Sequence, residues 1–289
     1  MATAREIKRR IKSVRSIGQV TRAMGMVAAS KMKRAQEQTL ATRPYAEKAW
    51  EVLRLLASQA AAGGTLHPLL AFRSVNTVGL LLITADRGLA GPFNHNMIRL
   101  AYEFMREEMR PVKLITVGRK GRDFMLRCGG EIVAEFTGIP DRPALIDITP
   151  IARTVLDDFL AGTFDQVIIA YTRFINTLVQ RPVLRQLLPL RTGEERVEGE
   201  YIYEPDPQTI LGQVLPRFTE LQVYQAILES IASEQSARMV AMRNATDNAE
   251  ALVEDLTLSY NRVRQEAITK EIMDIAGGAE ALAKARVRA

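Results

Sequence analysis

The sequence has few of the features that mark secreted, membrane-spanning or metal-binding proteins. Its 289 residues contain a single cysteine, Cys128, which excludes an internal disulfide and favours a reducing compartment. No stretch approaches 18 uninterrupted apolar residues, so the sequence predicts no direct membrane span, and its first residues lack the apolar core of a signal peptide. The two histidines, His67 and His95, have no cysteine or carboxylate at ligand spacing, so we expect no metal site.

Motifs for nucleotide binding and catalysis are missing as well. The sequence has no G-x-x-x-x-G-K-[ST], no G-x-G-x-x-G after its first strand, and no recognisable Ser-His-Asp set. Asp86 and Arg87 follow the first predicted strand, where a small anion or substrate would bind, but a loop ion pair or a helix cap is the commoner role of such residues. Gly118 and Gly121 resemble a phosphate cradle only weakly and are typical of a strand-to-helix turn. We therefore expect no catalytic residue and no cofactor.

Glycine and proline are also absent from residues 217–276, and this segment carries the strongest pattern of the chain. A mostly apolar seam recurs there in steps of three and four, which is a heptad register sustained over about eight heptads. The seam consists of Leu211, Val214, Phe218, Leu221, Gln225, Leu228, Ala232, Gln235, Met239, Met242, Thr246, Ala249, Val253, Leu256, Tyr260, Val263 and Ala267. The pattern predicts one long helix from about residue 208 that pairs with another helix.

The N-terminal region predicts the second helix of the pair. Residues 3–43 follow helical periodicity and the pattern resumes from Tyr45 to Gln59, with Pro44 as a possible site of a kink. Gly18 and Gly25 are unfavourable in a helix interior, so we expect a second helix to approach closely there. Residues 1–43 hold 11 Lys and Arg against two Glu, which fits either a polyanion or an acidic protein surface. The absence of aromatic residues from this segment argues against nucleic acid.

Between the helices, short apolar runs alternate with helical patterns. Strands are expected at 77–84, 112–117, 131–136 and 166–173, helices at 96–109, 119–127 and 150–161, and an antiparallel edge strand at 181–190. This alternation predicts a doubly wound, Rossmann-like α/β domain inserted into an antiparallel coiled coil. The expected domains are residues 1–60, the N-terminal coiled-coil helix; 75–200, the α/β domain; and 208–289, the C-terminal coiled-coil helix.

The two helical arms differ in length, so the end of the longer one has no matching helix in this chain. The C-terminal arm is longer by some 20 residues, or about 30 Å, if the arms pair outward from the inserted domain. The surplus carries Ile268, Ile272, Ile275 and Leu282, and no residues of this chain remain to cover them. An unmatched apolar stripe on a long helix predicts a partner.

Several long stretches resemble one family. Residues 268–279 (ITKEIMDIAGGA) resemble the C-terminal signature of the ATP synthase gamma subunit. Residues 21–32 (TRAMGMVAASKM) and 233–248 (SEQSARMVAMRNATDN) are similar to other stretches of that family, as are 86–91 (DRGLAG) and 201–206 (YIYEPD). The resemblance is collinear and covers essentially the whole chain. Ala90 stands where many relatives have cysteine, and the cysteine-bearing regulatory loop of chloroplast relatives is missing.

The resemblance implies the central rotor shaft of a proton-translocating ATP synthase. In that family the terminal helices form a coiled coil inside a ring of alpha and beta subunits, and the α/β domain is a foot beside the epsilon subunit and the c-subunit ring. Catalysis belongs to the beta subunits, so this chain would couple proton flow to ATP synthesis or hydrolysis without a catalytic site of its own. The implied location is the cytoplasmic face of a bacterial plasma membrane, as a peripheral protein.

The resemblance also implies which residues meet partners. The positions that match contacts with the beta subunits are Met24, Arg238, Arg264, Gln265, Thr269 and Glu271. Those that match the connector facing the c ring and epsilon are Tyr201, Tyr203 and Glu204. Each has a plainer role as an alternative: Met24 would pack in the helix seam, and Arg264 would pair with Tyr260 or a nearby acid.

Two other functions remain as alternatives. One is a non-catalytic coiled-coil scaffold that binds a different oligomeric ATPase. The other is an α/β enzyme with coiled-coil arms, which requires a ligand pocket near Asp86 and Arg87.

Overall fold

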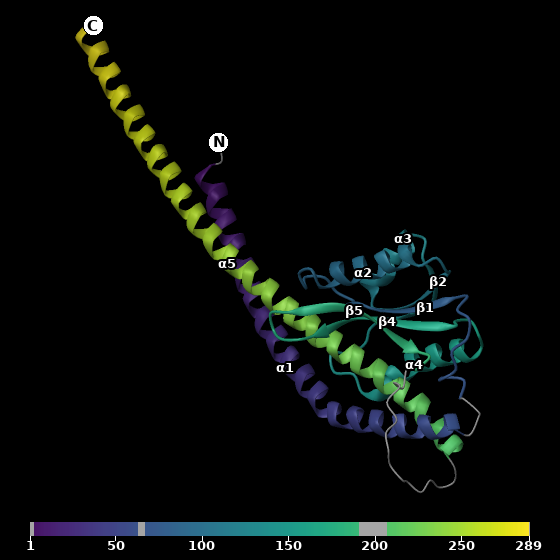
Figure 1. The fold of residues 1–289 in the computed structure, drawn as a ribbon. Helices are drawn as coiled ribbons and strands as arrows, with labels where there is room; N and C mark the ends of the chain where they lie inside the picture. The colour runs from purple at the N-terminus through teal and green to yellow at the C-terminus, as the bar shows by residue number, and fades with distance from the viewer. Residues whose placement is uncertain (1–2, 63–66, 191–206, 289) are drawn as a thin grey trace. The chain divides into compact units, whose positions relative to one another are not determined.

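The computed structural model describes residues 3–62, 67–190 and 207–288 of the chain. Two long helices enclose a five-stranded α/β region in the sequence (Figure 1). The elements are α1 (Ala4–Ala62), β1 (Val78–Ile83), α2 (Phe93–Glu107), β2 (Val112–Val117), α3 (Arg119–Arg127), β3 (Glu131–Phe136), α4 (Leu145–Leu160), β4 (Gln166–Phe174), β5 (Gln180–Leu188) and α5 (Pro207–Arg288).

The chain divides into two compact units. The helical unit consists of α1 up to Met26 together with α5 from Ala241 onward. The α/β unit consists of residues 27–240, which include the sheet, the rest of α1 and the first part of α5. The three domain ranges expected from the sequence stay a prediction.

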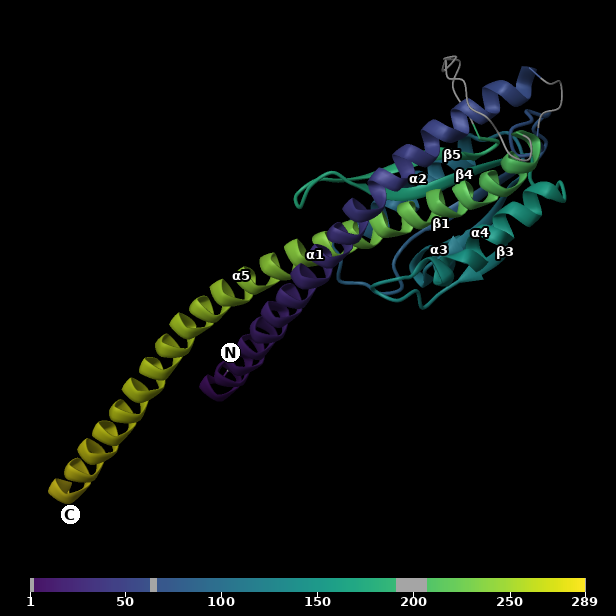
Figure 2. The same ribbon diagram turned by 90° about the horizontal axis from the view of Figure 1, so that it is seen from below.

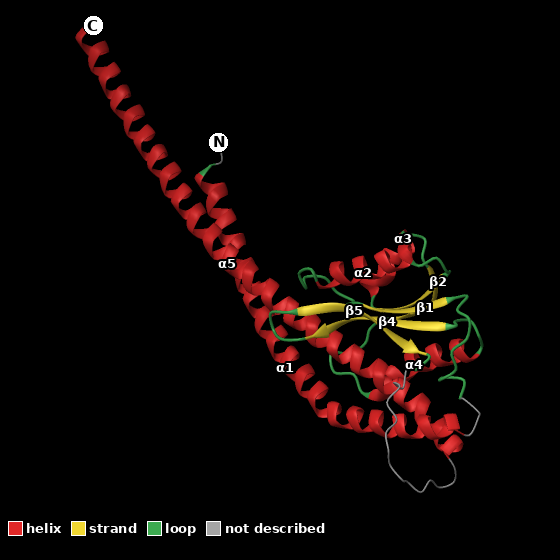
Figure 3. Cartoon of the chain, viewed as in Figure 1, coloured by secondary structure: helices red, strands yellow, loops and turns green. Residues whose placement is uncertain are grey.

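The sheet has the strand order β3-β2-β1-β4-β5 (Figure 3). The first four strands in the chain are parallel to one another, and β5 is antiparallel to β4 at one edge. Every residue of β1 is buried, because this strand lies in the centre of the sheet with helices on both faces. The predicted doubly wound α/β fold, inserted between two long helices, is confirmed.

The two faces of the sheet bury separate apolar clusters. On one face α4 and the start of α5 cover a cluster that includes Leu81, Phe159 and Leu228, and on the other face α2 and α3 cover Leu80, Met97 and Met125 (Figures 1 and 2). Leu80 and Leu81 are neighbours on β1 and point to opposite faces, as the alternation of a strand requires.

Where β4 extends beyond β1, serine side chains of α5 form the hydrogen bonds to its backbone that a neighbouring strand would otherwise form. The pairing of β1 with β4 ends at Ala170. At Thr172 the backbone N–H donates to Ser230 Oγ (3.2 Å), and Ser233 Oγ donates to the Thr172 carbonyl oxygen (3.1 Å). These bonds satisfy buried backbone groups and hold α5 at a defined register along β4.

Two helices begin earlier than expected, α2 at Phe93 instead of residue 96 and α4 as follows. α4 begins at Leu145, five residues before the predicted start at Pro150, because Asp147 Oδ2 accepts the N–H of Ala144 (2.8 Å) and thereby caps the helix earlier. Pro150 consequently lies inside α4. The expected N-terminal helix is present as α1, which continues through Pro44 to Ala62.

Candidate partner-binding surfaces

The helical unit is an antiparallel pair whose register the sequence left open. Thr21 Oγ1 and Thr246 Oγ1 are hydrogen-bonded at 2.8 Å, and a Cβ added to Gly18 would lie 3.4 Å from the Cβ of Ala249. In both pairs the residue numbers add to 267, so the two contacts belong to one antiparallel register. The close approach expected at Gly18 is therefore confirmed, and small seam residues on both helices permit it.

Burial along α5 follows the predicted seam. In the helical unit Met242, Thr246 and Ala249 are buried, and Val253, Leu256, Tyr260 and Val263 are half-buried, whereas their neighbours on the helix are mostly exposed. The heptad register predicted from the sequence thus identifies the side of α5 that α1 covers.

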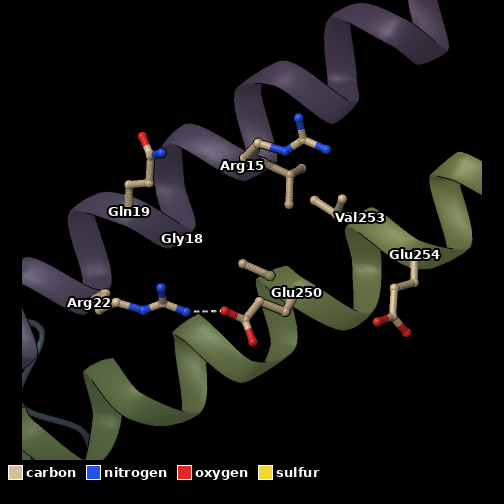
Figure 4. Close-up of a pocket in the computed structure, with 9 residues that line it drawn as sticks. Arg15, Gly18, Gln19, Arg22, Glu250, Val253 and Glu254 are labelled. Carbon is tan, nitrogen blue, oxygen red and sulfur yellow. Dashed lines mark hydrogen bonds and ion pairs between the residues drawn. The ribbon is translucent and has the colours of Figure 1, made fainter.

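An open groove lies between the two helices of this unit (Figure 4). Its volume is about 380 Å³, and it exists because Gly18 and Ala249 leave little side chain between the helix backbones. Arg15, Gln19 and Arg22 line it from α1, and Glu250, Val253 and Glu254 from α5, with Val14 completing the apolar wall. Arg22 and Glu250 form an ion pair across it. The groove could not be predicted from the sequence, because it depends on the register that brings Gly18 opposite Ala249.

The last part of α5 has no partner in the chain. By the register above, Ala4 at the start of α1 lies opposite Val263, so about 25 residues of α5, or about 37 Å, extend beyond the pair. Ile268, Ile272 and Ile275 are 48%, 62% and 68% exposed on this overhang. The predicted overhang with an uncovered apolar stripe is confirmed for these three residues, whereas the side chain of Leu282 lies outside the described ones.

The isoleucine stripe does not simply continue the seam. Ile268 and Ile272 are displaced by one residue from Ala267 and the seam positions before it, which corresponds to about 100° around the helix axis. A partner of the overhang therefore approaches α5 from a different side than α1 does.

Four of the residues predicted to contact the beta subunits lie on the overhang. Arg264, Gln265, Thr269 and Glu271 are exposed. Among the described residues Arg264 has no ion-pair partner, and the neighbouring pair is instead Arg262–Glu266 (3.2 Å). These side chains are thus accessible to another protein, and their contact with beta stays a prediction.

The other two predicted contacts lie elsewhere and are less accessible. Met24 is half-buried on α1. Arg238 is nearly buried in the α/β unit, where it pairs with Glu234 (2.7 Å) and donates from Nη2 to the Gly88 carbonyl oxygen (3.2 Å). Burial raises the pKa of the Glu234 carboxyl, and the guanidinium of Arg238 opposes this shift. Arg238 therefore connects α5 to the loop after β1.

The connector residues Tyr201, Tyr203 and Glu204 lie outside the described residues. Their predicted contact with the c ring and epsilon stays a prediction.

The turn after β1, considered above as a possible ligand site, is a structural junction. Asp86 Oδ1 accepts the N–H of Arg119 at the start of α3 (3.0 Å), and Oδ2 accepts the N–H of Gly138 (2.8 Å). A Cβ on Gly118, which has φ of +94°, would lie 2.1 Å from the Thr84 carbonyl oxygen. Gly118 thus permits close backbone packing. The arrangement joins three loops, and both oxygens of the Asp86 carboxylate accept hydrogen bonds within it.

The described residues contain no group of three or more His, Cys, Asp and Glu side chains placed to hold a metal ion. Over the same part of the chain, no helix combines the length and the apolar character that crossing a membrane requires.

Comparison with known proteins identifies the family. Residues 3–282 match the family model described as ATP synthase. The ATP synthase gamma chain of Dehalococcoides mccartyi (strain ATCC BAA-2266 / KCTC 15142 / 195) is 56% identical over 288 residues, which cover 98% of this chain and 100% of that protein.

Solved structures agree with this assignment. A chain in the cryo-EM structure of the Tetrahymena thermophila mitochondrial ATP synthase central stalk and c ring is 26% identical with a TM-score of 0.62, covering 78% of this chain and 99% of that one. A chain in the cryo-EM structure of the Euglena gracilis mitochondrial ATP synthase has the same fold, with a TM-score of 0.72 at 20% identity over 96% of this chain and 94% of that one. The chain belongs to the family of ATP synthase gamma chains.

Proposed function

We propose that this gamma chain is the rotating central shaft of a bacterial ATP synthase, with α1 and α5 inside a ring of alpha and beta subunits. The α/β unit would be the foot that meets the epsilon subunit and the c-subunit ring at the cytoplasmic face of the plasma membrane. The observation that carries the proposal is the overhang of α5, whose exposed isoleucines match no surface of the helical unit. A surrounding ring of subunits would cover such a stripe.

The proposed mechanism is mechanical. A shaft can shift a catalytic site between conformations only through a difference in its contact free energy with those conformations. The overhang presents different chemistry around its axis, since the isoleucines and the seam lie about 100° apart. Identical beta subunits arranged around the overhang would thus contact different sides of α5. Rotation of the shaft would bring each side in turn to each catalytic site.

The polar residues of the overhang add to the difference between its sides. Arg264, Gln265, Thr269 and Glu271 offer charge and hydrogen bonds on α5, and we assign them, with Met24 and Arg238, to contact with the beta subunits. The basic N-terminal segment would face acidic surfaces of the same subunits. The connector residues Tyr201, Tyr203 and Glu204 are assigned to the c ring and epsilon.

The test uses the assembled enzyme purified through a tag on the full-length chain. Full-length chain should retrieve a stoichiometric pair of larger ATPase subunits. Replacing Ile268, Ile272 and Ile275 together by Ser, or ending the chain at Ala267, should lower ATP-driven proton pumping relative to ATP hydrolysis. The matched control replaces Lys270 and Asp274, which are exposed on the same overhang, by Ser and should leave that ratio unchanged. A chain that purifies alone, or a stripe variant that pumps like the control, would refute the proposal.

A further inference from the structure

The hairpin between β4 and β5 ends in an apolar tip, residues 175–179. Ile175, Leu178 and Val179 are 48%, 81% and 42% exposed. They are consecutive or nearly so, and the hairpin between β4 and β5 that carries them lies at one end of the sheet (Figure 1). Large apolar side chains gathered on one short protruding loop are typical of a contact surface rather than of a solvated turn.

The backbone of this tip is already hydrogen-bonded within the chain. Asn176 Oδ1 accepts the N–H groups of Leu178 (2.9 Å) and Val179 (2.8 Å). Gln180 Nε2 donates to the carbonyl oxygen of Thr177 (2.9 Å). These bonds fix the conformation in which the apolar side chains point outward, so a partner that binds the tip would lose little loop entropy.

The tip is also fixed to α5. Ser236 Oγ donates to the Thr177 carbonyl oxygen (2.6 Å), and Gln180 Nε2 also donates to Ser236 Oγ (3.2 Å). Ser236 follows Ser230 and Ser233 at intervals of three residues, and all three serines bond the β4 strand or the hairpin that follows it. A force applied to the tip is therefore transmitted to the long helix through defined polar contacts.

Two arginines face each other at the base of the hairpin. Arg173 and Arg181 are directly opposite in the antiparallel register of β4 and β5, so their side chains lie on the same face of the sheet. Both are exposed, and within the described part of the chain neither forms an ion pair or a hydrogen bond. Like charges in this arrangement are destabilising, and an external carboxylate would relieve the repulsion.

We propose that the tip and these two arginines form a docking surface for a segment of another ATP synthase subunit that carries carboxylates beside apolar residues. A carboxylate binds between Arg173 and Arg181, and apolar side chains pack on Ile175 and Leu178. The inference rests on the proposed function in one respect, since it takes the partner from the same complex.

A protein partner fits these features better than a lipid surface does. The planar guanidinium of arginine pairs with a carboxylate through two parallel hydrogen bonds, which requires a partner of fixed geometry. The tip is rigid and presents only three apolar residues, whereas interfacial membrane binding relies on a larger amphipathic surface.

Photo-crosslinking in the assembled enzyme tests the surface directly. A photoreactive benzoylphenylalanine replaces Leu178 in the full-length chain, and the matched control carries it at Met109, which is fully exposed elsewhere in the α/β unit. We expect position 178 to crosslink a peptide of another subunit that contains Asp or Glu beside apolar residues, and position 109 not to crosslink that peptide. Absence of a protein crosslink at position 178 overturns the proposal.

The arginine pair supplies a second, independent readout. Replacing Arg173 and Arg181 together by Gln should lower the crosslinking yield at position 178 about tenfold, because two charge-assisted contacts are lost. The melting temperature of the isolated chain should stay unchanged or rise, since the repulsion is removed as well. The control Arg106→Gln with Arg153→Gln removes two exposed charges elsewhere and should leave the yield unchanged. An equal yield in both double variants contradicts the proposal.

Vesicles of phosphatidylcholine and phosphatidylglycerol distinguish the lipid alternative. Binding of the full-length chain to them that disappears in the Arg173→Gln, Arg181→Gln variant, without a protein crosslink, would assign the surface to lipid and overturn the proposal. The shaft function fails separately, through the pumping ratio of the isoleucine variants, so the two failures are distinguishable.

Discussion

The helical unit and the α/β unit bury very different amounts of apolar side chain. In the α/β unit all six residues of β1 are buried between helical layers. In the described part of the helical unit only Ile7, Met242, Thr246 and Ala249 are buried. Since burial of apolar surface is the main favourable contribution to folding, we expect the α/β unit to be the more stable of the two and the helical unit to gain stability when a partner covers it.

A cavity in the α/β core should have the largest effect. Leu81 has no exposed surface and lies in the centre of the sheet, so Leu81→Ala should lower the free energy of unfolding of the α/β unit by about 2–5 kcal/mol. Hydrogen exchange read by mass spectrometry would report this as faster exchange throughout β1, β2 and β4. Leu126→Ala, at a residue that is 56% exposed, is the control and should change little. A similar loss from both would mean that β1 is not the stabilising centre.

Two glycines should respond to the same substitution with opposite signs. A Cβ on Gly121 would lie 2.8 Å from Thr84 Oγ1, whereas one on Gly18 would lie 3.4 Å from the Cβ of Ala249, an ordinary contact. Gly121→Ala should therefore destabilise the α/β unit by about 1–3 kcal/mol. Gly18→Ala should stabilise the helical unit by up to about 1 kcal/mol through higher helix propensity. Hydrogen exchange in α3 and in the first turns of α1 would measure both, and two changes of the same sign would contradict the difference in packing.

The contrast between the units also explains what the sequence could and could not predict. Strands β2 and β3 were predicted to the residue, because continuous or bounded apolar runs between turn residues mark them. The seam of α5 was likewise predictable from its period. Its register with α1 was not, since small residues such as Ala249 and Thr246 accept several neighbours equally well.

The remaining misses have two causes, one local cap and contacts between distant segments. Pro150 suggested a helix start, but the cap supplied by Asp147 moved it to Leu145. The groove beside Gly18 and the facing pair of Arg173 and Arg181 depend on which residues face each other across helices or strands. A single sequence indicates the faces but not these pairings.

The free energy of unfolding of the α/β unit should depend on pH through the ionisation of Asp165. Backbone N–H groups of Asn76 (2.8 Å) and Thr77 (3.1 Å) lower the pKa of this carboxyl below its ordinary value, and Arg73 contributes in the same direction. Because the pKa of Asp165 is lower in the folded state, its carboxylate stabilises the folded chain. This stabilisation is complete at pH values above the pKa in the unfolded chain, and it is lost as the pH falls through the pKa in the folded chain.

Asp165→Asn should consequently destabilise the unit near neutral pH, and the difference from the original chain should shrink as the pH falls below about 4, the ordinary pKa of an aspartate. Urea unfolding at several pH values would show this. Asp157→Asn, at an exposed carboxylate of α4, is the control and should show no such convergence. A difference that stays constant with pH would contradict the assigned role of Asp165.

The smallest effect is expected from the ion pair in the groove of the helical unit. Arg22 and Glu250 have side chains that are 57% and 58% exposed, so solvent screens their attraction and the pair should contribute less than about 1 kcal/mol. A double-mutant cycle with Arg22→Ala and Glu250→Ala, read by hydrogen exchange in α1 and α5, measures the coupling. It should fall further as salt is added. A coupling above about 2 kcal/mol would show that charge, rather than the small seam residues, fixes the register of the helical pair.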